Sequence, residues 1–122
     1  MDLAEGKYLL LTTFRKNGDG VPTPVWFAGE GRTAFVWTVA ESGKVKRIRR
    51  SGDVLVGPCD VRGNPLGESV PARAELVDVA ETDRVRERII RKYGVIGRLT
   101  ILGSKLRRGK KGTVGIKITL ST

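Results

Sequence analysis

The sixteen residues FVWTVAESGKVKRIRR, Phe35 to Arg50, carry the strongest indication of the fold. Phe35 to Val39 predicts a buried strand, and a short turn then leads into a helix whose first turn carries lysines. Ser42 is the expected N-cap of this helix, Gly43 would let a ligand approach the backbone, and Gly52 is the expected stop. A strand that leads into a helix N-terminus presents unpaired N–H groups and the positive end of the helix dipole to an anion.

Only two residues of this helix, Val45 and Ile48, form an apolar stripe, so the basic residues are expected to point outward. These basic residues are Lys44, Lys46, Arg47, Arg49 and Arg50. Runs of charge are usually solvent-exposed faces. The stretch is therefore equally compatible with an anion site and with a solvated basic helix lying on a barrel.

The composition predicts one soluble domain with polyanionic partners. The chain has 122 residues, and 23 Lys and Arg against 13 Asp and Glu give a net charge of +10. Nucleic acid, an anionic membrane surface, or a phosphorylated or polycarboxylated small molecule would fit this charge. No run approaches the ~20 apolar residues of a membrane span. The first six residues lack the pattern of a signal peptide, and the single cysteine, Cys59, is expected to pack in the core, so a cytoplasmic location is expected.

The chain contains no histidine. This absence excludes histidine-based triads, histidine metal ligands and histidine acid–base catalysis. With one cysteine and scattered carboxylates, no metal site is expected. If the protein is an enzyme, its reactive chemistry is expected to come from a bound organic cofactor.

Apolar runs and turn residues predict six antiparallel strands closed into a small β-barrel, with helices inserted between them. Pro22 and Pro24 predict an edge or a kinked entry in the second strand, because proline cannot donate a ladder hydrogen bond. The first strand is expected to be buried on both faces. The predicted strands cover 7–14, 21–28, 33–39, 53–60, 68–80 and 113–120.

A second helix is predicted between Thr82, its expected N-cap, and Gly94. Val85, Ile89 and Tyr93 recur at every fourth position and form its apolar face. Residues 95–106 are expected to form another short helix. The basic run from Lys105 to Gly112 is expected to be a solvated loop or a frayed helix end.

Four pieces of the sequence follow one another in a recognisable order. The pieces are YLLLTT at Tyr8–Thr13, PVWF at Pro24–Phe27, FVWT at Phe35–Thr38 followed by SGKVKR at Ser42–Arg47, and DVLV at Asp53–Val56. Together they resemble the pyridoxamine 5′-phosphate oxidase-like split β-barrel superfamily, and within it the branch of deazaflavin (coenzyme F-420)-dependent oxidoreductases. The resemblance spans residues 7–120 and implies an FMN-binding type of split barrel as a single domain, with a short form of the N-terminal helix usual in the family.

The resemblance also implies a homodimer with a cofactor groove between its subunits. It places the ring system of the cofactor against the second strand, at Pro24, Val25 and Trp26. It places the phosphate end at the close of the third strand and the following helix start. The residues implied at the phosphate end are Thr38, Ser42, Lys44 and Lys46.

Coenzyme F-420 is the favoured cofactor, and FMN is the alternative. The excess of basic residues suits the oligoglutamate tail of the deazaflavin, which Arg47, Arg49, Arg50 and the Lys105–Lys111 run could contact. The implied activity is hydride transfer between the deazaflavin and an organic substrate, with no catalytic side chain assigned. A carrier or sensor of the same fold without turnover remains an alternative.

A nucleic-acid-binding barrel is a lower-ranked alternative, because neither basic run contains an aromatic residue for stacking bases. Trp26 is expected either at the ring system or at a subunit interface. Trp37 is expected in the core or at an interface.

Overall fold

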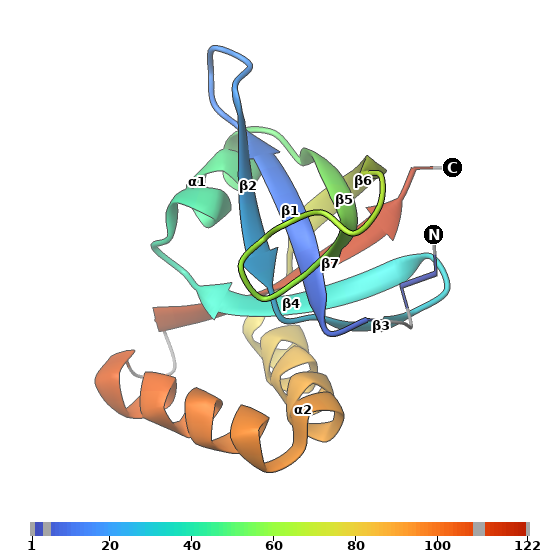
Figure 1. Ribbon diagram of the computed structural model, residues 1–122. Coiled ribbons are helices and arrows are strands. Elements are labelled where there is room, and N and C mark those ends of the chain that lie inside the picture. The colour runs from blue at the N-terminus through green and yellow to red at the C-terminus, as the bar shows by residue number, and fades with distance from the viewer. Residues whose placement is uncertain (1, 4–5, 109–111, 122) are drawn as a thin grey trace.

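The computed structural model describes residues 2–3, 6–108 and 112–121, and for 95–108 it describes the backbone only. The chain forms a mainly β structure with helices packed on the outside (Figure 1). In chain order the elements are β1 (Tyr8–Phe14), β2 (Gly20–Val25), β3 (Ala28–Glu30), β4 (Thr33–Val39), α1 (Gly43–Arg50), β5 (Asp53–Cys59), β6 (Val70–Leu76), α2 (Val79–Arg108) and β7 (Thr113–Leu120).

One antiparallel sheet of seven strands, in the order β2-β1-β5-β6-β7-β4-β3, curls around the core. The predicted antiparallel split-barrel class is confirmed, and the predicted number of six strands is wrong. The expected 21–28 strand ends at Val25, and Ala28–Glu30 forms β3, which pairs with β4 instead. The expected edge is confirmed, because β2, which carries Pro22 and Pro24, is an outermost strand.

The strand breaks at Trp26 and Phe27 because the backbone of Phe27 bonds to side chains of α2. The Phe27 N–H donates to the Tyr93 hydroxyl at 3.1 Å, and the Phe27 carbonyl accepts from Lys92 Nζ at 2.8 Å. After the break, Gly29 allows a tight return, since a Cβ there would lie 2.2 Å from the Thr33 carbonyl oxygen. Contacts with a distant helix therefore replace the ladder bonds that a continuous strand would make.

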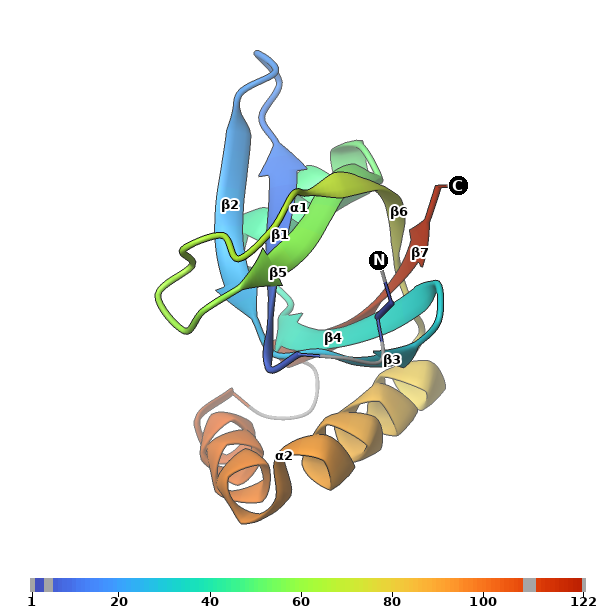
Figure 2. The same cartoon turned by 45° about the vertical axis from the view of Figure 1, so that its right-hand side comes forward.

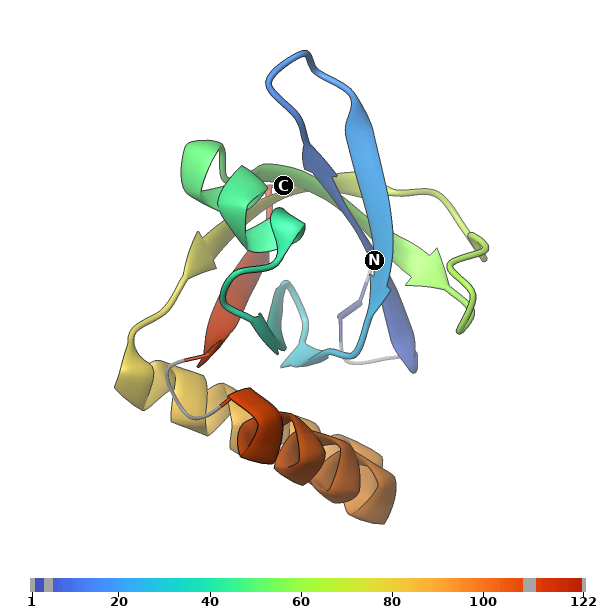
Figure 3. The same cartoon turned by 90° about the vertical axis from the view of Figure 1, so that its left-hand side faces the viewer.

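The main core lies inside the curled sheet. Leu9, Leu10 and Leu11 are buried in succession, as expected for a strand covered on both faces. α1 packs against this core through Val45 and Ile48, which are 0% and 5% exposed, and this confirms the predicted apolar stripe. α1 and α2 lie on different sides of the barrel (Figure 3).

α2 packs against the outer face of the sheet, below β3 and β4 (Figure 2). Val85 and Ile89 are buried there against Ala28, with aromatic residues around them. Gly115 of β7 gives α2 room to approach, because a Cβ on it would lie 3.1 Å from the Val85 side chain. No helix in the described part of the chain is long and apolar enough to cross a membrane.

The helix ends differ in part from the prediction. α2 begins at Val79, where Asp78 Oδ1 accepts from the Glu81 N–H at 2.8 Å, so the assignment of Thr82 as the N-cap is wrong. Thr82 is buried and accepts a hydrogen bond from the Gly115 N–H at 2.9 Å. The predicted break at Gly94 is confirmed by a φ of 63°.

The basic run at the end of α2 is helical as far as Arg108, and residues 109–111 lie outside the described part. At the end of α1, Ser51 is the C-cap and its N–H donates to the Arg47 carbonyl. Gly52 follows directly, where the helix stop was predicted, but it does not have the positive φ typical of a helix-ending glycine. Gly52 instead allows a close approach, because a Cβ there would lie 2.5 Å from the Ala74 carbonyl oxygen.

Candidate functional site

The start of α1 has a buried hydroxyl with no partner among the described residues. Ser42 stands at the N-cap as predicted, with φ −67° and ψ 157°, but its side chain makes no capping bond. Its Oγ is buried and unpaired in the described part of the chain. A buried polar atom without a partner costs free energy, so the position is suited to a hydrogen bond from a ligand.

Basic side chains converge on this helix start. The Arg47 guanidinium lies over Gly43, where a Cβ would be 2.8 Å from Arg47 Nη1, and Arg47 Nε donates to Thr13 Oγ1 at 2.6 Å. Burial and the nearby Arg47 charge lower the pKa of Lys44. Burial and the nearby Arg15 charge lower the pKa of Arg47. We call Arg15, Lys44 and Arg47 the α1 cation cluster.

No ion pair joins the α1 cation cluster to a carboxylate within the described residues. Gathering like charges without a counterion is unfavourable for the free protein, and a bound anion would relieve the repulsion. The α1 cation cluster, the N–H groups at the start of α1 and the Ser42 hydroxyl are together the kinds of group that bind phosphate.

The residues expected at the phosphate end are only partly brought together. Lys44 is half-buried within the cluster, whereas Lys46 is exposed. Thr38 lies near the end of β4, is 9% exposed and pairs in register with Val114. The sequence pattern predicts that Arg47 points outward, yet its side chain turns back to the helix start. Its position three residues after Lys44 was the available signal, because such pairs share a helix face.

The residues expected to line the ring system follow one another at the end of β2 but differ in exposure. The Pro24 side chain is exposed, and Val25 is 9% exposed and belongs to the main core. The Val25 side chain is therefore not available to a ligand. The Trp26 ring stacks on Tyr93 of α2, with centroids 4.3 Å apart and planes 7° apart.

Tyr93 has a larger part in the structure than its place on an apolar helix face indicated. Its hydroxyl donates to the Lys7 carbonyl and accepts from the Phe27 N–H. Burial raises its pKa. Trp37 packs in the same cluster beside α2, and its Nε1 is buried without a partner among the described residues. The aromatic residues that pack here therefore come both from the barrel, with Trp26 and Trp37, and from α2, with Tyr93.

The register of the hairpin relates the two parts of the candidate site. Thr13, which bonds Arg47, is opposite Val21, and Val25 is four residues farther along β2. At about 3.3 Å per residue, this separation is roughly 13 Å. The α1 cation cluster and the end of β2 are therefore separated along the hairpin by this length.

No protein-family model matches this sequence, and no curated protein sequence matches it. Solved structures do match its fold. A candidate pyridoxamine 5′-phosphate oxidase from Listeria innocua is 20% identical with a TM-score of 0.67, and the match covers 98% of this chain and 88% of that one. An F-420 reductase is 18% identical with a TM-score of 0.60, covering 98% and 90%.

An FAD-binding protein from Mesorhizobium loti matches at 14% identity with a TM-score of 0.65, over 98% of this chain and 85% of that one. All three matches therefore cover nearly the whole curled sheet and its helices. Their low sequence identity makes this a likeness of fold. The protein has the split β-barrel fold of the pyridoxamine 5′-phosphate oxidase-like proteins.

Proposed function

We propose that this protein is an oxidoreductase that binds the deazaflavin coenzyme F-420, with FMN as the alternative cofactor. The observation that carries the proposal is the α1 cation cluster, Arg15, Lys44 and Arg47, next to the buried Ser42 hydroxyl. Both cofactors have a phosphate joined to a flat ring system. The F-420 reductase among the structural matches supports the choice of the deazaflavin.

The chain's own residues would bind and orient the cofactor. Lys44 and Arg47 would neutralise the phosphate, and Ser42 Oγ would donate a hydrogen bond to one of its oxygens. Pro24 and the β2 backbone would contact the ring system of the cofactor. Bound there, the coenzyme would supply hydride transfer to an organic substrate, and the protein would contribute orientation and exclusion of water.

The test is a titration of the purified protein with coenzyme F-420, with FMN and with a single-stranded oligonucleotide, followed by fluorescence. We expect low-micromolar binding of F-420. Lys44→Ala should weaken it at least tenfold, which is about 1.4 kcal/mol. Arg84→Ala is the control, because Arg84 is an exposed arginine on α2, which lies on a different side of the barrel from α1 (Figure 3).

Unchanged affinity in Lys44→Ala would contradict the site. Tighter binding of FMN than of F-420 would select the alternative cofactor. Tight oligonucleotide binding with a steep salt dependence and no F-420 binding would favour the nucleic-acid-binding barrel. Binding without turnover of any acceptor would leave a carrier or sensor role.

We also propose that the functional unit is a homodimer. The loop between β5 and β6 projects beside β2 (Figure 2) and exposes large apolar side chains, with Val61 62% and Leu66 70% exposed. The loop lies against β2, since a Cβ on Gly63 would be 3.4 Å from Pro24. Asp60 Oδ1 fixes the loop by accepting from the Asn64 N–H at 2.9 Å. A hydrogen-bonded loop that exposes two large apolar side chains next to β2 suits contact with a second copy.

In a dimer with two-fold symmetry, each contact residue occurs twice. We therefore expect Leu66→Ser to raise the dimer dissociation constant tenfold or more, because burying a leucine stabilises by about 1.5–3 kcal/mol. Mass measured across a dilution series checks this. Val79→Ser is the control, because Val79 is equally exposed, at 74%, but begins α2. A monomer at micromolar concentration would contradict the shared groove.

A further inference from the structure

A basic cavity lies between β3 and the first half of α2, apart from α1. It has a volume of about 360 Å³ and is open to solvent. Its lining consists of Ala28, Gly29, Arg88, Arg91 and Lys92. The three cations are spaced i, i+3 and i+4, so they share one face of the helix.

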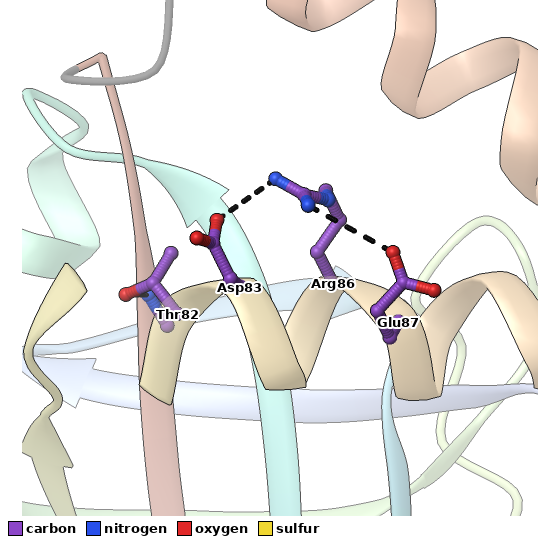
Figure 4. Close-up of polar contacts among 5 residues, drawn as sticks. Thr82, Asp83, Arg86 and Glu87 are labelled. Carbon is purple, nitrogen blue, oxygen red and sulfur yellow. Dashed lines mark hydrogen bonds and ion pairs between the residues drawn. The ribbon is translucent and has the colours of Figure 1, made fainter. Parts of the chain in front are cut away.

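Two other arginines of α2, Arg84 and Arg86, are paired with carboxylates. Arg86 Nη1 lies 2.9 Å from Asp83 and Nη2 lies 3.8 Å from Glu87 (Figure 4). Arg84 likewise lies 2.8 Å from Glu81. These pairs neutralise one part of the helix surface.

The cavity cations lack such pairs. No ion pair joins Arg88, Arg91 or Lys92 to a carboxylate in the part of the chain that the structure describes. Their positive charges therefore meet at an open cavity without a counterion. A ligand that supplies the missing negative charge would bind favourably there.

Aromatic rings of β4 and of the break between β2 and β3 lie against two of these cations. The Arg88 guanidinium carbon lies 4.7 Å from the centroid of the Phe35 ring. Lys92 Nζ lies 3.5 Å from the centroid of the Phe27 ring and donates to the Phe27 carbonyl. A guanidinium stacked by its face keeps its N–H edges free for a carboxylate or phosphate, and an ammonium with one bond used has two donors left.

The cavity points to a ligand with more than one negative charge. Three cations without an ion-pair partner among the described residues line this one cavity, so a ligand with a single negative charge would leave two of them uncompensated. Partial burial also lowers the pKa of Lys92, an effect that a bound anion would oppose. The cavity volume is in the range of small-molecule sites, roughly 300–1,000 Å³.

No aromatic ring lines the cavity, so it lacks a stacking platform for the bases of a single-stranded nucleic acid. We propose that the cavity formed by Arg88, Arg91 and Lys92 binds a small polyanion with at least two phosphate or carboxylate groups. The proposal does not depend on the cofactor proposal, because the cavity is lined by residues of α2, and α1 and α2 lie on different sides of the barrel (Figure 3).

The test is calorimetric titration with pyrophosphate and, separately, with citrate at low salt. It uses protein carrying Lys44→Ala and Arg47→Met, so that the α1 cation cluster does not contribute. We expect saturable binding of at least one probe. Adding Arg88→Gln and Arg91→Gln together should weaken binding at least tenfold, while adding Arg84→Gln should change it less than twofold.

Arg84 is the matched control because it lies on the same helix, its side chain is 69% exposed, and it does not line the cavity. The probe that binds more tightly distinguishes a phosphate ligand from a carboxylate ligand. Three results would overturn the proposal. They are no binding of either probe at millimolar concentration, equal binding after the Arg88 and Arg91 substitutions, and tighter binding of an oligonucleotide than of both probes.

Discussion

Ile89→Ala should lower the free energy of unfolding by about 2–5 kcal/mol, because it leaves a cavity where α2 meets the sheet. Ile89 is 2% exposed and packs with Ala28 and Val85 in the cluster beneath β4. Stabilities of small domains are typically about 5–15 kcal/mol, so this loss would be a large share of the total. Urea unfolding followed by circular dichroism measures it.

Ile90→Ala is the matched control for this substitution. Ile90 is the next residue on the same helix and is only partly buried at the edge of the cluster, so its truncation should cost clearly less. Tryptophan fluorescence gives a second readout, because Trp26 stacks on Tyr93 of α2. Equal losses from the two alanine variants would contradict the observed docking of α2.

Arg47→Met should weaken binding of coenzyme F-420 by tenfold to hundredfold, about 1.4–2.8 kcal/mol. Arg47 lies over Gly43 at the start of α1, within the α1 cation cluster. Charge-assisted hydrogen bonds contribute about 1.5–3 kcal/mol, and methionine keeps much of the apolar stem while removing the charge. Fluorescence titration measures the loss.

Arg84→Met serves as the control for the Arg47 substitution, because Arg84 is exposed on α2, on a different side of the barrel from α1 (Figure 3). The pKa of Lys44 gives an independent readout by NMR of the labelled side chain. Arg47 is one of the two causes that lower this pKa, so Arg47→Met should raise it toward 10.5 in the ligand-free protein. An unchanged affinity together with an unchanged Lys44 pKa would remove Arg47 from the site.

The lowered pKa of Lys44 makes folding stability depend on pH. Lys44 loses its proton at a lower pH when folded than when unfolded. As pH rises from the lowered pKa to 10.5, the unfolded state holds more protons at Lys44, so the contribution of Lys44 to stability rises. Affinity for an anion falls over the same window, because the folded lysine loses its charge.

Much of the sheet could be predicted from the sequence, because alternation and turn residues act locally. The strands expected at 33–39 and 113–120 coincide with β4 and β7. Their side chains alternate between the core and the outer face, as in the burial of Ala34, Val36 and Thr38 along β4. The helix face formed by Val85 and Ile89 was predictable for the same reason.

The break between β2 and β3 could not be predicted in this way. The groups that bond the Phe27 backbone belong to Lys92 and Tyr93, 65 and 66 residues away in the sequence. A local pattern contains no information about a partner at that separation. The sequence pattern therefore predicts one strand over 21–28, whereas β2 ends at Val25.

The candidate site shows the same division. The sequence by itself determined the antiparallel barrel, the helix that follows β4, the apolar stripe of Val45 and Ile48, and the basic character of the helix start. Only the tertiary structure decided that Arg47 turns inward to Thr13 and that Trp26 stacks on α2. Periodicity places a residue on a face of its own element, whereas the partner that a long side chain reaches depends on which distant element packs there.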